Sequence, residues 1–127
     1  MANIIGIGID ICEILRIKRL YEKYNHSFLK KILTEKEIQD FYERNESLSF
    51  LAGRFAAKES IVKALGTGFT GGISFQDFTV FNDKYGAPKL DIMNNALEIK
   101  EAKNINQIHL SISHEKNYAV ASVILEK

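Results

Sequence analysis

Two carboxylates in this sequence have the surroundings expected of metal ligands or of helix caps. Asp10 ends a short apolar segment in which Gly6 and Gly8 alternate with isoleucine. Glu59 precedes Lys63 by about one helical turn, so their side chains share a helix face. Two carboxylates completed by waters and phosphate oxygens form a common Mg²⁺ site. The alternatives are a helix cap for Asp10 and a Glu59–Lys63 surface salt bridge. Spacing alone does not bring Asp10 and Glu59 together.

The helix predicted over residues 48–65 carries a lysine on an apolar face. A helical wheel places Lys58 in the middle of a stripe formed by Leu51, Phe55, Val62 and Leu65. A lysine in that position must extend to solvent, form an ion pair or reach into a cleft. A second stripe, about 100° round the helix, leaves room for close approach of a ligand and consists of Ala52, Ala56, Glu59 and Lys63.

A glycine-rich segment follows this helix directly. Gly66-Thr-Gly-Phe-Thr-Gly71 matches the G-x-G-x-x-G pattern of dinucleotide-binding folds. It follows a helix, however, where that fold requires a strand, so the dinucleotide interpretation fails. Backbone amides in such a segment can come close to a phosphate. The alternative is a flexible turn between helix and sheet.

The other reactive residue types are sparse. Cys12 is the only cysteine, which excludes a disulfide within one chain. Strand alternation puts His109, Ser111 and Ser113 on one face, with His114 at a turn. Their spacing does not match a zinc site, and it defines no Ser-His-Asp triad.

Length and composition limit the class of protein. The 127 residues suit one domain without repeats or linkers. A net charge of +1 excludes a strongly basic nucleic-acid-binding protein. Residues 15–36 are nevertheless basic, which indicates an acidic partner or a solvated helix face. Apolar runs stay below the roughly 18 residues of a membrane span, and the first ten residues lack the basic start of a signal peptide. We expect a reduced, cytoplasmic protein without a membrane or nucleic-acid partner.

The order of the predicted elements indicates an α+β domain. Thr34 to Glu37 has the capping-box pattern that starts a helix, and Gly66 ends the longest helix. Because helices gather early and antiparallel strands late, we expect one domain over residues 1–127, with an N-terminal strand and helices packed on an antiparallel sheet. The predicted elements are a buried strand over 3–9, helices over 13–25, from about 35 and over 48–65, strands over 73–81 and 87–92, a short helix over 94–103, and a hairpin of 108–113 and 118–126 with its turn at 114–117.

The helix predicted over residues 13–25 has an apolar face and a basic face. The apolar face consists of Ile14, Ile17, Tyr21 and Tyr24. Three cations around a leucine suit the docking of an acidic protein, and a solvated helix surface is the alternative. This opposite, basic face consists of Arg16, Arg19, Leu20 and Lys23.

Together these segments resemble the holo-acyl-carrier-protein synthase family. The resemblance covers essentially the whole chain, and the block from Arg54 to Glu59 with the following glycine turn is its most specific part. It rests on Gly6-Ile-Gly-Ile-Asp10, Phe28-Leu-Lys-Lys-Ile-Leu-Thr-Glu-Lys-Glu37, Phe50-Leu-Ala-Gly-Arg-Phe-Ala-Ala-Lys-Glu59, Lys63-Ala-Leu-Gly-Thr-Gly68, Phe75-Gln-Asp-Phe78, Leu110-Ser-Ile-Ser-His114 and Tyr118-Ala-Val-Ala121.

The resemblance implies a 4′-phosphopantetheinyl transferase of α+β fold. Such enzymes move phosphopantetheine from coenzyme A to a serine of apo acyl carrier protein, require Mg²⁺, release adenosine 3′,5′-bisphosphate and support fatty acid biosynthesis. Family members of this size form homotrimers with active sites at subunit interfaces.

The family's functional residues have matching positions in this chain. Asp10 and Glu59 match its metal carboxylates, and Lys63 matches the lysine that faces the pyrophosphate. Glu59 and Lys63 are therefore the expected catalytic residues. The basic face of helix 13–25 (Arg16, Arg19, Leu20, Lys23) matches the part that docks the carrier. The expected coenzyme A site consists of Arg54, Lys58, Lys63, Gly66, Thr67, Gly68 and His114.

Phosphoryl transfer depends on in-line positioning and on neutralisation of charge, which suits a metal ion beside a lysine. Either Glu59 or a metal-held water takes the serine proton, and the sequence does not choose between them. Two other classes of protein fit the sequence less well. A binding module without catalysis does not need both Asp10 and Glu59. A nucleic-acid-binding domain is disfavoured by the near-neutral charge and by the lack of RNA-binding motifs.

Overall fold

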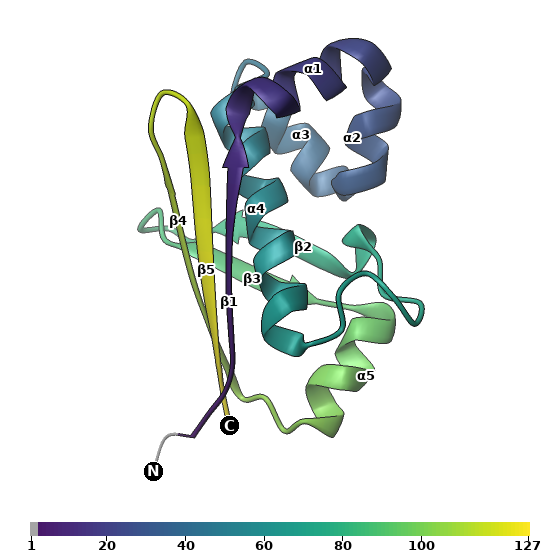
Figure 1. Ribbon diagram of the computed structural model, residues 1–127, viewed down its shortest axis with the longest axis vertical. Coiled ribbons are helices and arrows are strands. Elements are labelled where there is room, and N and C mark those ends of the chain that lie inside the picture. Colours follow the sequence, from purple (N-terminus) through teal and green to yellow (C-terminus); the bar gives the residue numbers. More distant parts are fainter. Residues whose placement is uncertain (1–2) are drawn as a thin grey trace.

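The chain folds around one long helix, α4, which lies between a sheet and a group of shorter helices (Figure 1). This computed structural model describes residues 3–127. The elements are, in chain order, β1 (Ile4–Glu13), α1 (Ile14–Tyr24), α2 (His26–Ile32), α3 (Glu35–Glu43), α4 (Leu48–Leu65), the 3₁₀ turn η1 (Phe75–Asp77), β2 (Phe78–Asn82), β3 (Pro88–Ile92), α5 (Asn94–Ala102), β4 (Gln107–His114) and β5 (Tyr118–Glu126).

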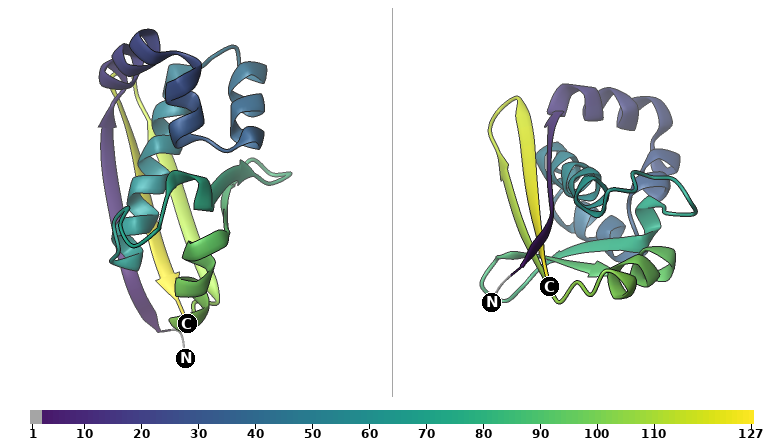
Figure 2. Two further views of the ribbon diagram at one scale, coloured as in Figure 1. Left: turned by 90° about the vertical axis from the view of Figure 1, so that its right-hand side faces the viewer. Right: turned by 60° about the horizontal axis from the view of Figure 1, so that its bottom comes forward.

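The strands form two antiparallel sheets. The larger sheet has the order β1-β5-β4, so the first and last strands of the chain are neighbours. They pair from Ile4 opposite Glu126 to Glu13 opposite Tyr118. The smaller sheet is the β2–β3 hairpin, whose strand β3 lies against β4 at the edge of the larger sheet, and α4 contacts both sheets (Figure 2). The expected α+β fold with antiparallel sheets is confirmed.

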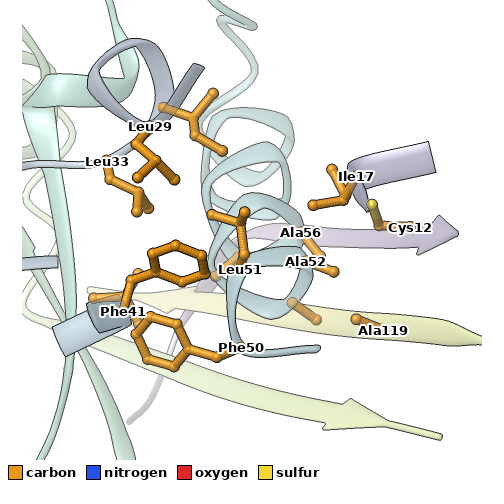
Figure 3. Close-up of a cluster of buried hydrophobic side chains, with 14 of the residues drawn as sticks. Cys12, Ile17, Leu29, Leu33, Phe41, Phe50, Leu51, Ala52, Ala56 and Ala119 are labelled. Atoms are coloured by element: carbon orange, nitrogen blue, oxygen red, sulfur yellow. The ribbon is translucent and has the colours of Figure 1, made fainter. Parts of the chain in front are cut away.

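Helix α4 forms the centre of the core. Its first turn is capped by Ser47, whose hydroxyl accepts a hydrogen bond from the backbone N–H of Phe50. It ends at Gly66, whose φ of 80° is readily available only to glycine. Ala52 and Ala56 are as fully buried as Leu51. The expectation of a single core face is therefore too narrow, because the sheet covers one side of α4 and the helices α1–α3 cover the other (Figure 3).

Strand β1 differs from the predicted buried strand. It is an edge strand that is longer than predicted, and only one of its faces packs on α4. The other face exposes Ile7, Ile9 and Ile11 by 61–67%. The run of isoleucines suggested burial on both faces, but the alternating glycines already identify the side that lies against the helix.

Two further elements were missed or misplaced. Helix α2 was not predicted, although it buries Phe28, Leu29 and Ile32. The strand predicted over residues 73–81 starts only at Phe78, because Asp77 leaves the sheet to accept a hydrogen bond from the backbone N–H of Ala96. Helix α5, the β4–β5 hairpin and the Thr34–Glu37 capping box are confirmed. No helix in residues 3–127 has the length and apolar character needed to cross a membrane.

Candidate active site

Asp10, Glu59 and Lys63 meet where β1 crosses α4. The Lys63 ammonium lies 3.0 Å from Asp10 Oδ1 and 3.0 Å from the carbonyl oxygen of Ile9. Asp10 does not cap α1, whose N-cap is Glu13. Within residues 3–127, Lys63 forms its salt bridge with Asp10 and not with Glu59. Both alternatives to a functional cluster, the helix cap and the surface salt bridge, are thus wrong.

The two carboxylates of this cluster influence each other. Burial raises the pKa of Glu59, and the nearby charge of Asp10 raises it further. Lys63 and Arg16 oppose this rise. Two ionised carboxylates so close together repel each other. A cation bound between them would remove this repulsion and stabilise the charged form of both.

The chemistry of this donor set fits Mg²⁺. No cluster of three or more His, Cys, Asp or Glu residues occurs within residues 3–127. Calcium and zinc sites usually need more protein ligands than two carboxylates. Magnesium, in contrast, commonly takes one or two carboxylates and completes its shell with waters and substrate phosphates. Asp10 and Glu59 are therefore the residues able to hold it.

Two glycines set the distance between β1 and α4. A Cβ atom on Gly8 would collide with the carbonyl oxygen of Ser60, and one on Gly6 would collide with that of Ala64. The strand consequently lies directly on the helix backbone. This close approach brings Asp10 to the same level as Glu59 and Lys63.

A second polar site lies on another side of α4, in a pocket of about 380 Å³. Arg54 and Arg44 both donate to Asn82 Oδ1, at 2.7 and 3.2 Å. Both guanidinium groups lie over the Phe50 ring, at 4.2 and 4.7 Å from its centroid. The other lining residues include His114 from β4, and none of them is acidic. We call this site the arginine pocket.

The arginine pocket contains a buried hydrogen-bond donor that has no partner within residues 3–127. This donor is the Nε of Arg54, a residue that is 5% exposed. Burial, and next the charge of Arg44, lower the pKa of Arg54 to about 10. Two neighbouring cations without a carboxylate in the pocket favour an anion such as a phosphate.

We call Asp10, Glu59 and Lys63 the carboxylate cluster; it and the arginine pocket do not face each other within one chain. Arg54 and Glu59 are five positions apart on α4, which separates their directions by about 140°. Asp10 belongs to β1 and His114 to β4, the two opposite edges of the larger sheet. Asp10, Glu59 and Lys63 are absent from the lining of the pocket.

Lys58 is not a ligand-binding residue, which corrects the sequence-based expectation. Its ammonium is completely buried and forms a salt bridge with Glu37 at 2.5 Å. It also donates to the carbonyl oxygens of Ile32 and Phe75, at 2.8 and 3.1 Å. Since an ammonium has three protons, all of its donors are used inside the protein.

The turn after α4 does not offer its first amides to a phosphate. The backbone N–H groups of Gly66, Thr67 and Gly68 all donate to the carbonyl oxygen of Val62. The interpretation of these three amides as a phosphate cradle is therefore wrong. Contact between coenzyme A and the surface of this turn stays a prediction.

Arg16 and Leu20 of α1 line a groove of about 460 Å³. Leu20 is half-buried. Arg19 and Lys23 are exposed on the same helix. The aromatic lining consists of Tyr24, Phe28, Phe55 and Phe75.

Comparisons with known proteins show the family of this chain. The family model of the 4′-phosphopantetheinyl transferase superfamily matches residues 6–123. The chain belongs to this superfamily. A holo-[acyl-carrier-protein] synthase of Clostridium tetani is 52% identical over 124 residues, covering 97% of this chain and 96% of the relative.

Solved structures of the family have the same fold. The holo-[acyl-carrier-protein] synthase of Neisseria meningitidis aligns with a TM-score of 0.92 and 37% identity, over 98% of this chain and all of that chain. That of Bacillus anthracis, solved in complex with CoA (3′,5′-ADP), aligns with a TM-score of 0.79 and 42% identity, over 98% and 97% of the two chains. The expected family is thus confirmed.

Arg44 and Asn82 belong to the arginine pocket, but no motif in the sequence points to them. Arg44 follows the last residue of α3, and Asn82 ends β2. The two residues are 38 positions apart and meet only in the folded chain. The one available signal was general: cations and amides at the ends of elements often bind ligands.

Proposed function

We propose that this protein transfers 4′-phosphopantetheine from coenzyme A to a serine of an apo acyl carrier protein, with Mg²⁺ as cofactor and adenosine 3′,5′-bisphosphate as the second product. This activity would supply holo carrier protein for fatty acid biosynthesis in the cytoplasm. The observation that carries the proposal is the cluster of Asp10, Glu59 and Lys63 at the crossing of β1 and α4. Membership of the transferase superfamily supports the reaction.

The residues of the cluster have separable tasks. Asp10 and Glu59 would hold Mg²⁺, which supplies positive charge next to the pyrophosphate of coenzyme A. Lys63 neutralises charge on the phosphoryl group that is transferred, because its ammonium already lies beside the carboxylates. Glu59 must be deprotonated both as a ligand and as an acceptor of the serine proton.

The arginine pocket suits the remote phosphate of coenzyme A. Arg54 and Arg44 converge on it, and the free Nε of Arg54 offers a further donor. His114 adds a ring nitrogen from β4. The Bacillus anthracis relative is described as a complex with CoA (3′,5′-ADP), which supports a nucleotide with a 3′-phosphate as the ligand.

Two features of one chain support the expected homotrimer with shared active sites. The cluster and the arginine pocket face different sides of α4, so a single coenzyme A molecule reaches both most easily across two subunits. The isoleucines at positions 7, 9 and 11 expose an apolar sheet face that a neighbouring subunit would cover. We expect light scattering to give three times the 14.4 kDa of one chain; an active monomer would contradict shared sites.

The carrier protein would dock on α1. Arg19 and Lys23 attract its acidic surface, and the neighbouring groove accepts an apolar side chain. The charge of Arg16 lowers the pKa of Glu59, so the groove and the carboxylate cluster are neighbours. A carrier docked on α1 would therefore bring its serine toward Glu59.

One experiment tests the reaction. Apo carrier protein, coenzyme A and Mg²⁺ are incubated with the protein, and mass spectrometry measures the phosphopantetheine adduct on the carrier serine. The adduct and adenosine 3′,5′-bisphosphate should appear in equal amounts. No adduct with several apo carriers, together with no loss of coenzyme A, would refute the proposal.

A further inference from the structure

The buried salt bridge between Lys58 and Glu37 joins five separate elements of the fold. The Glu37 carboxylate accepts hydrogen bonds from the backbone N–H groups of Thr34 and Val80, both at 2.8 Å. Lys58 contributes its bonds to Glu37, to Ile32 and to Phe75. The pair thereby connects α4 with the end of α2, the start of α3, η1 and β2.

Three of the five connected elements also carry residues of the arginine pocket. Arg54 is one turn before Lys58 on α4, and Arg44 is the C-cap of α3, whose first turn contains Glu37. Asn82 is two positions after Val80 on β2. Helices α3 and α4 and strand β2 thus each bring one pocket residue and one point of attachment to the salt bridge.

We infer that the Lys58–Glu37 salt bridge is the positioning joint of the arginine pocket, holding α3, α4 and β2 so that Arg44, Arg54 and Asn82 converge on one phosphate. The two joint residues touch no ligand and act only through the elements that they connect. The role of the pocket as a nucleotide site rests on the proposed function.

Burial makes this joint both rigid and sensitive. Both side chains are completely removed from solvent, and each of their charged groups is used in full by hydrogen bonds. Breaking one partner of such a pair leaves an uncompensated buried charge. Loss of the joint should therefore loosen β2 against α4, although the Arg54–Asn82 hydrogen bond and the core packing of β2 remain.

Two substitutions cut the joint at different places. In Glu37→Gln the side chain keeps its shape, but its new NH₂ group must face either the Lys58 ammonium or the N–H of Val80, and both are donors. In Lys58→Met the flexible chain keeps most of the volume, and Glu37 retains Thr34 and Val80. If one variant does not fold, the other still tests whether the salt bridge holds α4 in place against α3 and β2.

Ser60→Ala is the matched control. Ser60 is also fully buried on α4, but its hydroxyl lies within hydrogen-bond distance of the carbonyl oxygens of Ala56 and Ala121, so it connects the helix to β5. This variant loses stability without touching α3 or β2. Comparing variants of equal stability separates positioning from general destabilisation.

The first readout needs no ligand. Amide hydrogen exchange is measured for residues 78–82 at a temperature where all variants are folded. We expect exchange there to be about tenfold faster in Glu37→Gln or Lys58→Met than in Ser60→Ala at matched stability. Equal exchange in the joint variants and the control would overturn the inference.

The second readout is nucleotide affinity. Titration calorimetry with adenosine 3′,5′-bisphosphate should show a dissociation constant about tenfold higher in the joint variants than in Ser60→Ala. The KM for coenzyme A should rise likewise, while the KM for the carrier stays unchanged. Unchanged affinity in the joint variants would also overturn the inference. If the wild-type protein does not bind the nucleotide, the proposed function fails, and hydrogen exchange still decides whether the joint exists.

Discussion

The carboxylate cluster and the arginine pocket are built in opposite ways. The cluster brings unlike charges together from two elements, β1 and α4, and its Lys63 already has a carboxylate partner. The pocket brings two like charges together, Arg44 at the end of α3 and Arg54 on α4, and Arg54 has a donor without a partner within residues 3–127. In the cluster, the charge of Lys63 is already partly neutralised by a carboxylate. In the pocket, neutralisation of the arginine charges is left to an anionic ligand. The difference predicts that the cluster governs turnover and the pocket governs affinity.

The largest effect should come from the carboxylates of the cluster. Asp10→Asn or Glu59→Gln removes a charged oxygen ligand, and we expect kcat to fall by about 10²–10³-fold or more. The phosphopantetheine adduct is measured by mass spectrometry, and circular dichroism checks the fold. The exposed carboxylate of Asp91 on β3 provides the control, since Asp91→Asn should be fully active. Substantial turnover in either cluster variant, or full activity of the wild type in excess chelator, would contradict the assignment.

The next effect concerns Lys63 and separates catalysis from binding. In Lys63→Ala we expect kcat to fall by about 10²-fold while the KM for coenzyme A changes much less, because the ammonium acts on charge that develops in the transition state. Steady-state kinetics at saturating Mg²⁺ measure both constants, with Lys89→Ala on β3 as the control. If only the KM for coenzyme A rises, Lys63 contributes to substrate binding and not to stabilisation of the transition state.

Arg44 tests the other half of the comparison. Arg44→Ala should raise the KM for coenzyme A by about tenfold and leave kcat nearly unchanged, because it removes one of two cations from a site that binds an anion. The effect should shrink at high salt, since Arg44 is exposed. Lys84→Ala, in the neighbouring β2–β3 turn but outside the pocket lining, is the control. If kcat falls while the KM for coenzyme A stays constant, the conclusion that the arginine pocket governs affinity and the cluster governs turnover is wrong.

The smallest effect is expected on α1, outside both sites. Reversal of Arg19 and Lys23 to Glu should raise the KM for the carrier protein by about three- to tenfold, most at low salt, and leave the KM for coenzyme A constant. Arg16 is left intact because it acts on the pKa of Glu59. The same reversal of Lys100 and Lys103 at the end of α5 provides the control. If neither the KM for the carrier nor the KM for coenzyme A changes, the basic face of α1 is only a solvated surface. If both KM values rise, α1 shapes the nucleotide site instead.

Local patterns in the sequence predicted much of the fold. The capping box at Thr34 and the glycine after α4 are short-range signals, and both helix ends are where they were predicted. Helix α2 was missed because it has only seven residues, too few for a clear period. The burial of β1 was overestimated because edge position depends on partners from the other end of the chain.

The candidate site was predictable only where one element carries the signal. The shared face of Glu59 and Lys63 follows from helix geometry, whereas their meeting with Asp10 rested on resemblance. Lys58 shows the limit most clearly. The wheel placed it correctly on a core face, but its partner Glu37 is 21 positions away. A ligand-binding lysine and a buried ion pair therefore looked the same in the sequence.

The pairing of β1 with β5 has a consequence for the order in which the cluster forms during synthesis. Asp10 leaves the ribosome long before Ala121, its partner on β5. The sheet position of Asp10 therefore becomes fixed only after β5 has been synthesised, although α4 with Lys63 is made much earlier. A nascent chain that lacks β5 should therefore lack an ordered contact between Asp10 and Lys63.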